Sequence, residues 1–312
     1  MRIVFMGTPD YSVKTLKALI DAGHNILAVF AQPDKPQGRK QILTPVPVKQ
    51  FAQAENIPVY QPVTLRDGTA LKILEELSPD VIVVVAYGKI LPEEILRLPK
   101  YGCVNGHASL LPKYRGASPI QWCIVCGEQV TGVTTMFMDK GMDTGDILET
   151  AETKIGDTET AEELFLRLSD ISADLMVSTL DKLEKGEITP KKQCEEQATY
   201  APIIKKDMAQ LDFNLSAKEV FCAVRGYYSW PCAFFFLEGK RVKVIESRIA
   251  GKTSAKPCEV YESENRLLIA CGDGNGIELV KVQPEGSKPM SASQWLCGHK
   301  ISVGTKIIRE NA

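Results

Sequence analysis

The sequence predicts an α/β protein in which a doubly wound parallel sheet is followed by a small β-barrel, and three observations carry this prediction. The chain opens with an apolar run at 2–7, a helical pattern at 13–19 and a second apolar run at 25–31, which is a β-α-β order. The stretch VIVVVA at 81–86 is apolar without alternation, which is typical of a central strand buried on both faces. The last third holds short β-like runs separated by Gly-containing turns.

Further signals complete the N-terminal domain in an alternating order of helices and strands. Gly186 marks the end of its last and longest helix. This order predicts a Rossmann-like sheet with helices on both faces. The predicted elements are helices over 71–77, 93–98 and 160–183 and strands over 102–105 and 130–138.

A polar, Pro-containing segment separates the two predicted domains. We expect a catalytic α/β domain at 1–188, a linker at 189–205 and an OB-like β-barrel at 206–312. From Lys206 to the end the net charge is +3, against −5 for the rest of the chain, which predicts an anionic partner for the second domain. Its β-like runs cover 233–237, 242–246, 267–270 and 277–282.

The composition excludes several classes of protein. Of 312 residues, 44% are hydrophobic and 24% are charged, which is typical of a globular protein and not of a disordered one. The sequence shows neither a membrane-spanning run nor a signal-peptide pattern. Nine scattered cysteines predict reduced thiols, and the Cys123–Cys126 pair has no second pair at zinc-site spacing. We therefore expect a cytoplasmic monomer without metal or membrane.

The first strand-to-helix turn argues against a dinucleotide site. It reads Gly7-Thr8-Pro9-Asp10 instead of G-x-G-x-x-G. Pro9 removes an amide donor and Asp10 would repel a phosphate. An oxidoreductase that uses nicotinamide or flavin at this turn is disfavoured.

An amide and an imidazole stand two residues apart after the fourth strand, at Asn105 and His107. In an extended backbone alternate side chains share a face, so both can point at one spot beyond the carboxyl end of the sheet. Their N–H groups suit an oxygen that becomes negative in a tetrahedral intermediate. The alternative is that Asn105-Gly106 is a turn and that His107 is a surface group.

A loop rich in carboxylates, Asp139 to Asp146, follows the fifth strand near the same edge of the sheet. A carboxylate there can orient the ring of His107 and stabilise its charged form. The alternative is a loop that only caps its own turn.

The connection from Gln32 to Lys49 is too long for an ordinary β-α loop and carries several cations, including Arg39 and Lys40. A basic loop beside a site at the sheet edge could grip phosphates. The alternative is a solvated excursion of the chain.

Motifs along the whole chain resemble those of the folate-dependent formyltransferase family, and in particular its methionyl-tRNA branch. The two motifs nearest the C-terminus, at the linker and in the second domain, favour the tRNA branch over enzymes that share only the catalytic core. The matching motifs are GTPD at 7–10, QPD at 32–34, VVAYG at 84–88, SLLP at 109–112, RG at 115–116, MDTGD at 142–146, TYAP at 199–202 and WP at 230–231.

The resemblance implies an enzyme of translation initiation. It would transfer the formyl group of 10-formyltetrahydrofolate to the α-amino group of methionine on initiator methionyl-tRNA. The family's catalytic positions fall on Asn105, His107 and Asp143, and no metal is implied. The family pattern implies folate contacts at Tyr87, Gly88, Ser109, Leu110, Leu111 and Pro112, and tRNA contacts at Arg39, Lys40 and Lys206.

One departure from the family stands inside the catalytic motif. Between Asn105 and His107 the family usually carries a branched apolar residue, whereas this chain has Gly106.

Two other functions remain as alternatives: a folate-dependent formyltransferase acting on an amino-sugar nucleotide, and a non-catalytic RNA-binding protein.

Overall fold

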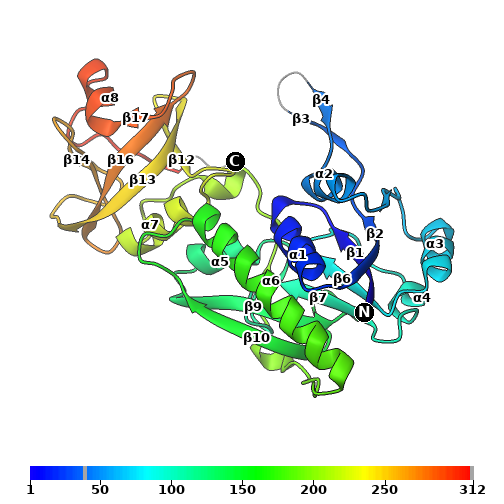
Figure 1. Ribbon diagram of the computed structural model, residues 1–312. Helices are drawn as coiled ribbons and strands as arrows, with labels where there is room; N and C mark the ends of the chain where they lie inside the picture. Colours follow the sequence, from blue (N-terminus) through cyan, green and yellow to red (C-terminus); the bar gives the residue numbers. More distant parts are fainter. Residues whose placement is uncertain (38–40, 310–312) are drawn as a thin grey trace. The chain divides into compact units, whose positions relative to one another are not determined.

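Two units make up the chain in this computed structural model, which describes residues 1–37 and 41–309 (Figure 1). No helix within these described residues has both the length and the apolar character needed to cross a membrane. The first unit consists of Met1–Pro119, Val130–Lys154 and Phe165–Ala201. The second unit consists of Ile120–Gln129, Ile155–Leu164 and Pro202–Ala312.

A seven-stranded sheet in the order β10-β9-β7-β6-β1-β2-β5 forms the frame of the first unit. The neighbours from β7 to β5 pair in parallel, whereas β9 is antiparallel to β7 and β10 to β9. This mostly parallel sheet confirms the predicted doubly wound fold. The strands are β1 (Arg2–Gly7), β2 (Asn25–Phe30), β5 (Val59–Tyr60), β6 (Val81–Val85), β7 (Cys103–His107), β9 (Val130–Phe137) and β10 (Ile147–Lys154).

Helices cover both faces of this sheet, which is why its central strands are apolar throughout. Tyr11 of α1 stacks edge-on against Phe165 of α6, on the face that Figure 1 shows under these two helices. On the other face, Leu74 of α3 and Ile95 of α4 pack against Ile82 and its neighbours. The helices are α1 (Asp10–Asp21), α2 (Pro47–Ala54), α3 (Thr69–Leu77), α4 (Glu93–Leu96) and α6 (Ala161–Lys185).

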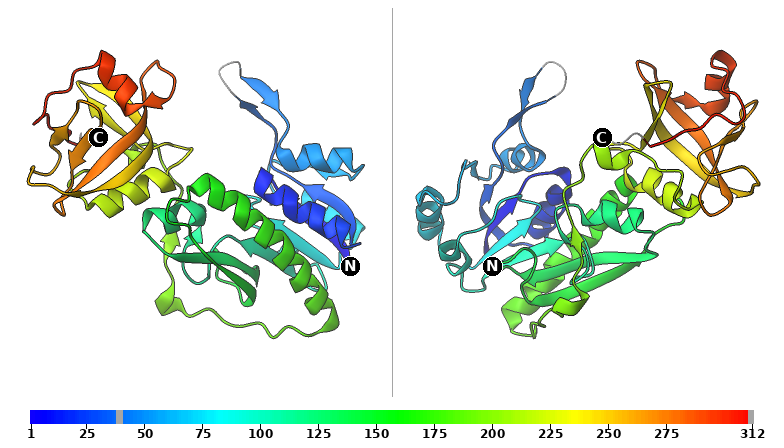
Figure 2. Two further views of the ribbon diagram at one scale, coloured as in Figure 1. Left: turned by 60° about the vertical axis from the view of Figure 1, so that its left-hand side comes forward. Right: turned by 180° about the vertical axis from the view of Figure 1, so that it is seen from behind.

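The long connection after β2 contains an antiparallel hairpin of β3 (Lys35–Gln37) and β4 (Ile42–Thr44), which projects away from the sheet (Figure 2). At its base Lys49 donates hydrogen bonds to Asp34 at 2.6 Å and to Gln61 at 2.7 Å. The predicted tRNA-binding residues Arg39 and Lys40 lie outside the residues that the structure describes.

The second unit contains a curled antiparallel sheet in the order β12-β13-β16-β15-β14, with β17 paired to β16. Strand β13 shifts register against β16 at several points, and such bulges increase twist and bend a strand. The sheet forms a half-barrel, in agreement with the predicted small β-barrel. The strands are β12 (Phe234–Leu237), β13 (Lys240–Lys252), β14 (Val260–Glu262), β15 (Leu267–Ala270), β16 (Asn275–Pro284) and β17 (Met290–Ser291).

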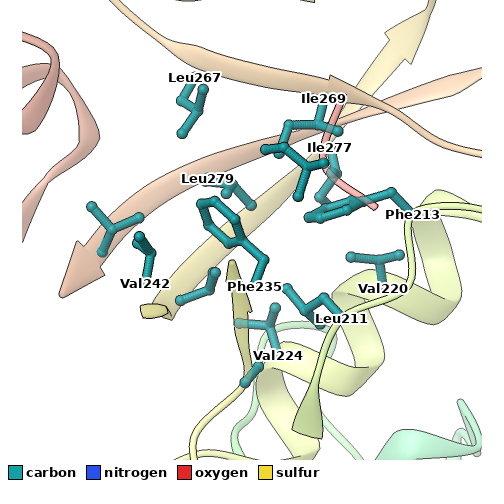
Figure 3. Packing of buried hydrophobic residues seen from close by; sticks show 14 of the residues in the cluster. Leu211, Phe213, Val220, Val224, Phe235, Val242, Leu267, Ile269, Ile277 and Leu279 are labelled. Carbon is teal, nitrogen blue, oxygen red and sulfur yellow. The ribbon is translucent and has the colours of Figure 1, made fainter. Parts of the chain in front are cut away.

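Helix α7 (Ala217–Gly226) fills the hollow of this half-barrel. Its residues Val220 and Val224 point toward Phe235 and the strands beyond it (Figure 3). A capping box starts the helix, because the Ser216 hydroxyl accepts from the amide of Glu219 and the Glu219 carboxylate accepts from the amide of Ser216. The remaining elements are β8 (Arg115–Gly116), α5 (Pro119–Val125), η1 (Glu195–Gln197), β11 (Tyr200–Ala201), η2 (Asp207–Ala209) and α8 (Ala292–Gly298).

Candidate active site

Strand β7 carries Asn105 and His107 on one face of the sheet. It pairs with β6 on one side, where Asn105 lies opposite Val84, and with β9 on the other, where His107 lies opposite Thr134. The turn alternative for Asn105-Gly106 is therefore wrong, because ladder pairing on both sides keeps this dipeptide extended. The alternation of side chains then directs Asn105 and His107 to the same face.

Gly106 lies between them on the opposite face, against α6. A Cβ atom at this position would stand 3.1 Å from Ser172 Oγ and 3.3 Å from Met176 Cε. These two side chains of α6 occupy the space that a branched residue would fill. The departure from the family pattern is thus matched by the packing behind the strand, away from the face that carries Asn105 and His107.

Two oxygen atoms flank the ring of His107. Its Nε2 lies 2.9 Å from the carbonyl oxygen of Tyr114, and its Nδ1 lies 3.6 Å from Oδ2 of Asp143. A carbonyl oxygen only accepts, so Nε2 carries the hydrogen. The second distance is that of an ion pair rather than of a tight hydrogen bond. The structure therefore brings together His107 and Asp143, as the sequence predicts.

The carboxylate of Asp143 is held from the other side by the backbone. Its Oδ2 accepts a hydrogen bond of 2.8 Å from the amide of Gly116. The backbone of Asp143 is left-handed, with φ at 57°, a conformation that Asp tolerates better than most residues. By contrast, Asp139 in the same loop accepts from the Gly141 amide and the Thr144 hydroxyl, so it caps its own turn.

Asn105 is buried, with 8% of its surface exposed. Among residues 1–37 and 41–309, nothing forms a hydrogen bond with its carboxamide. Its donors are therefore available to a bound molecule, next to His107 on the same face of β7.

Part of the predicted linker at 189–205 takes part in this site. Residues 191–201, which we name the strap, run along the loops that carry Tyr114 and Asp143. At one end Lys191 forms a bridge with Ile147, and at the other β11 pairs in parallel with β8. The Thr199 hydroxyl accepts from the amide of Tyr114 at 2.8 Å.

A fully buried arginine ties the strap to the site. Arg115 is 0% exposed, and its guanidinium donates to both carboxylate oxygens of Glu195 at 2.8 Å and to Oε1 of Gln193 at 2.9 and 3.0 Å. The hydrogen bonds with Glu195 raise the pKa of Arg115 above its ordinary value. The Nε2 of Gln193 donates to the carbonyl oxygens of Asp143 and Gly145, both at 2.8 Å. Neither Arg115 nor Gln193 was predicted as a site residue, and the TYAP motif was the only sequence signal pointing to the strap.

The four residues predicted to contact folate after β7 form a tightly bonded loop. Ser109 donates from its hydroxyl to the carbonyl of Lys113 at 2.6 Å. Thr134 of β9 binds both the carbonyl of Ser109 at 2.7 Å and the amide of Leu111 at 3.1 Å. These bonds fix the backbone of Leu110 and Pro112 between them.

Tyr87 and Gly88 follow directly after β6. The ring of Tyr87 belongs to the core on the α3 face, and its buried hydroxyl has no hydrogen-bond partner. Burial raises the pKa of Tyr87 to about 12. Gln32 donates to the carbonyl oxygens of Tyr87 at 3.1 Å and Gly88 at 3.2 Å, so the QPD motif holds this turn.

An open pocket of about 490 Å³ lies beside Gly88 in the first unit. Of the predicted folate residues, Gly88 lines it and the loop at 109–112 does not. Lys89 donates to the carbonyl oxygens of Pro62 and Val63, and burial and the neighbouring Lys35 lower its pKa. The pocket combines cations with apolar side chains; its lining residues are Gln32, Val63, Thr64, Leu65, Arg66, Gly88, Lys89 and Ile90.

Two further predictions concern groups outside this cluster. The described part of the chain contains no group of three or more His, Cys, Asp or Glu side chains that could hold a metal ion. Lys206 belongs to the second unit, where it is exposed and precedes the short helix η2.

Comparison with known proteins identifies similar sequences and folds. Residues 1–180 match the family model described as formyl transferase, and residues 203–300 match its C-terminal domain. The chain is 47% identical over 302 residues to methionyl-tRNA formyltransferase of Thermodesulfovibrio yellowstonii, with 97% of each chain covered.

Two solved structures share the fold at low sequence identity. One is the N-formyltransferase from Helicobacter canadensis in complex with folinic acid and dTDP-3-aminofucose, with a TM-score of 0.68, 19% identity and coverage of 90% of this chain and 98% of the other. The second is methionyl-tRNA formyltransferase from Clostridium thermocellum, with a TM-score of 0.54, 22% identity and coverage of 80% and 93%.

Proposed function

Because this chain belongs to the formyl transferase family, we propose that it transfers the formyl group of 10-formyltetrahydrofolate to the α-amino group of methionine on initiator tRNA. The full-length similarity to a methionyl-tRNA formyltransferase supports this acceptor. The observation that carries the chemistry is the pairing of an unpartnered, buried Asn105 carboxamide with the His107–Asp143 pair on the same strand face.

The reaction needs a place for negative charge and a route for a proton. The free amine of methionine attacks the formyl carbon, a C–N bond forms, and the formyl oxygen becomes an oxyanion. The Asn105 amide donates to that oxygen, as does the Nε2–H of His107. In the structure this Nε2–H donates to the carbonyl oxygen of Tyr114. During the reaction the same N–H group donates to the oxyanion, either in addition to the Tyr114 oxygen or instead of it.

Collapse of the tetrahedral intermediate completes the transfer. The bond between the formyl carbon and N10 of the folate breaks, and N10 takes up a proton while the amine nitrogen loses one. Asp143 faces Nδ1 of His107, where it holds the ring and helps to relay this proton. All steps take place between the two substrates, so no covalent enzyme intermediate is required.

The pocket beside Gly88 suits the folate donor. A folate has a flat ring system, an aminobenzoyl group and glutamate carboxylates. Val63 and Ile90 supply apolar surface for the rings, and Arg66 and Lys89 supply positive charge for the carboxylates. The turn at Tyr87 and Gly88 supplies fixed backbone at the edge of this pocket. The tightly bonded loop at 109–112 does not line the pocket, and its assignment to the pterin rests on the family pattern.

The tRNA acceptor requires positively charged surface. We assign contacts with its phosphates to Arg39, Lys40 and Lys206, and to the second unit, in a C-terminal region of net charge +3. The hairpin of β3 and β4 projects from the sheet, and hydrogen bonds from Lys49 fix its base.

A direct transfer assay tests the proposal. The protein is mixed with 10-formyltetrahydrofolate labelled in the formyl group and with methionyl initiator tRNA, and label is expected on the methionine nitrogen. A dTDP-amino sugar in place of the tRNA is the acceptor control. Label on the sugar and none on methionine would contradict the proposed acceptor, and label on neither would contradict the proposed reaction.

A further inference from the structure

The carboxamide of Gln193 lies between Arg115 and the loop that carries Asp143. Its Oε1 accepts from two nitrogens of Arg115, and its Nε2 donates to the carbonyls of Asp143 and Gly145. A guanidinium only donates and a carbonyl only accepts, so the amide can sit in one orientation. Arg115 is buried and in turn held by Glu195, which is 68% exposed.

These bonds act on the backbone that aims the Asp143 carboxylate. Asp143 is in the left-handed region, and its own carbonyl oxygen is one of the two atoms that Gln193 binds. The carboxylate then meets the amide of Gly116 and the ring of His107. A chain of hydrogen bonds therefore runs from the strap, through the loop backbone, to the side chain that faces Nδ1 of His107.

A carboxylate could not replace the amide of Gln193. In Gln193→Glu the oxygen facing Arg115 is kept, whereas the second oxygen meets two carbonyl oxygens where the native side chain makes two hydrogen bonds of 2.8 Å. The side chain keeps nearly the same volume, but an oxygen that only accepts replaces the N–H donor that faces the Asp143 loop. This substitution therefore isolates the two bonds from Gln193 to the loop.

We propose that Gln193, oriented by Arg115, is a positioning residue that sets the geometry of Asp143 and His107 from the strap. The inference rests on the proposed function in so far as these two residues serve formyl transfer. Gln193 itself is not assigned a contact with either substrate.

The test compares Gln193→Ala and Gln193→Glu with the same substitutions at Gln197, an exposed residue of the same type within the strap. Misplacement of a catalytic group by about 1 Å costs on the order of 10² in rate. We expect kcat to fall by about this factor in both Gln193 variants, with the KM for each substrate unchanged, and the Gln197 variants to match the native protein.

Nitrogen NMR of the histidine rings provides a readout that does not depend on turnover. The chain has three histidines, and His107→Gln identifies the signals of His107. We expect both Gln193 variants to move the ring nitrogen signals of His107 and to leave those of His24 and His299 in place. The Gln197 variants are expected to move none of the three.

The outcomes separate the positioning role from the proposed function. Native kcat together with unmoved His107 signals in both Gln193 variants overturns the inference, as does a rise in KM at constant kcat. If the native protein transfers no formyl group, the proposed function fails while the His107 signals still decide the positioning role. If Gln193→Ala has a lower Tm than the native protein, the positioning role is judged from Gln193→Glu alone. This variant keeps the side-chain volume and the oxygen that accepts from Arg115.

Discussion

Gly116 lies where the strap approaches the site, and replacing it with alanine is expected to weaken this contact. Its φ is +115°, a conformation that side chains other than that of glycine rarely adopt. A Cβ atom would stand 2.8 Å from the carbonyl oxygen of Ala201. That oxygen cannot withdraw freely, because it accepts hydrogen bonds from the amides of Ala117 at 3.0 Å and Ser118 at 3.2 Å.

The expected cost follows from these contacts. Holding a residue other than glycine in a sparsely populated backbone region costs about 1–3 kcal/mol. Displacing the Ala201 oxygen weakens two hydrogen bonds worth about 0.5–1.5 kcal/mol each. We expect Gly116→Ala to destabilise the contact between β8 and β11 by about 2–6 kcal/mol in total. The kcat should fall as well, because the Gly116 amide is a donor to Asp143.

Native-state hydrogen exchange is the suitable assay, because it reports the free energy of local opening amide by amide. The amides to follow are those of Arg115 and Ala117, which donate to the strap carbonyls of Thr199 and Ala201. Intrinsic fluorescence is less informative here, because all three tryptophans of the chain belong to the second unit.

Gly23→Ala is the matched control within the first unit. Gly23 has φ +82° and nothing within 4 Å of an added Cβ atom. Alanine there should destabilise the protein only through backbone strain, by about 1–2 kcal/mol. Exchange protection at Arg115 and Ala117 should be unaffected by this control. If these two amides are as well protected in Gly116→Ala as in the native protein, a Cβ atom at position 116 does not disturb the Ala201 carbonyl oxygen and the prediction is wrong.

Three further predictions concern catalysis, pH and tRNA. Asn105→Ala should lower kcat by about 10²–10³, the usual cost of losing one oxyanion donor, with an unchanged Tm; near-native turnover would remove Asn105 from the mechanism. Tyr87→Phe should raise the free energy of unfolding by about 1 kcal/mol or more, since it deletes a buried hydroxyl without a partner. The pKa of Tyr87 is about 12 in the folded protein and 10.0 in the unfolded chain. Between pH 10 and pH 12 the unfolded chain therefore loses this proton first, and the free energy of unfolding falls as the pH rises; below pH 10 Tyr87 causes no such decline. Urea titrations between pH 10 and pH 12 should show a smaller decline of the free energy of unfolding in Tyr87→Phe than in the native protein. An identical decline would contradict the raised pKa of Tyr87. Lys206→Glu should flatten the plot of log affinity for tRNA against log salt by about 0.9 per lost phosphate contact, whereas Lys185→Glu on α6 should leave it unchanged; equal slopes for all three proteins would exclude Lys206 from the interface.

The parts of the fold that could be predicted are those where local sequence and burial agree. Strands β1 and β6 are apolar throughout because helices cover both faces of the sheet, and both were predicted within a residue or two of their bounds. Strand β10 was missed. It lies at the sheet edge, and its polar sequence ILETAETK reflects exposure on alternate positions. Helix α7 was also missed, although Ser216 and Glu219 form a capping box that the sequence displays.

The site was predictable as far as it depends on one strand and on one motif. Alternation along β7 was enough to put Asn105 and His107 on one face, and the family motif indicated Asp143. The hydrogen bonds between Arg115 and Gln193 join residues 78 positions apart. Such a contact depends on tertiary folding, and the strap has no periodicity that would reveal it. The hydrogen bond from His107 Nε2 to the carbonyl oxygen of Tyr114 could not be predicted either, because every residue has a backbone carbonyl and the sequence does not show which one accepts.

The interleaving of the two units has a consequence for how the protein is made. The first unit is complete only when the strap, which ends at Ala201, has left the ribosome. Two segments of the second unit, Ile120–Gln129 and Ile155–Leu164, have been synthesised before that point. Domains generally fold as units during synthesis, so here neither can mature well ahead of the other. A protease or a gene truncation that cuts once, for instance after Gly186, would leave the N-terminal fragment without its strap and the C-terminal fragment without two of its segments.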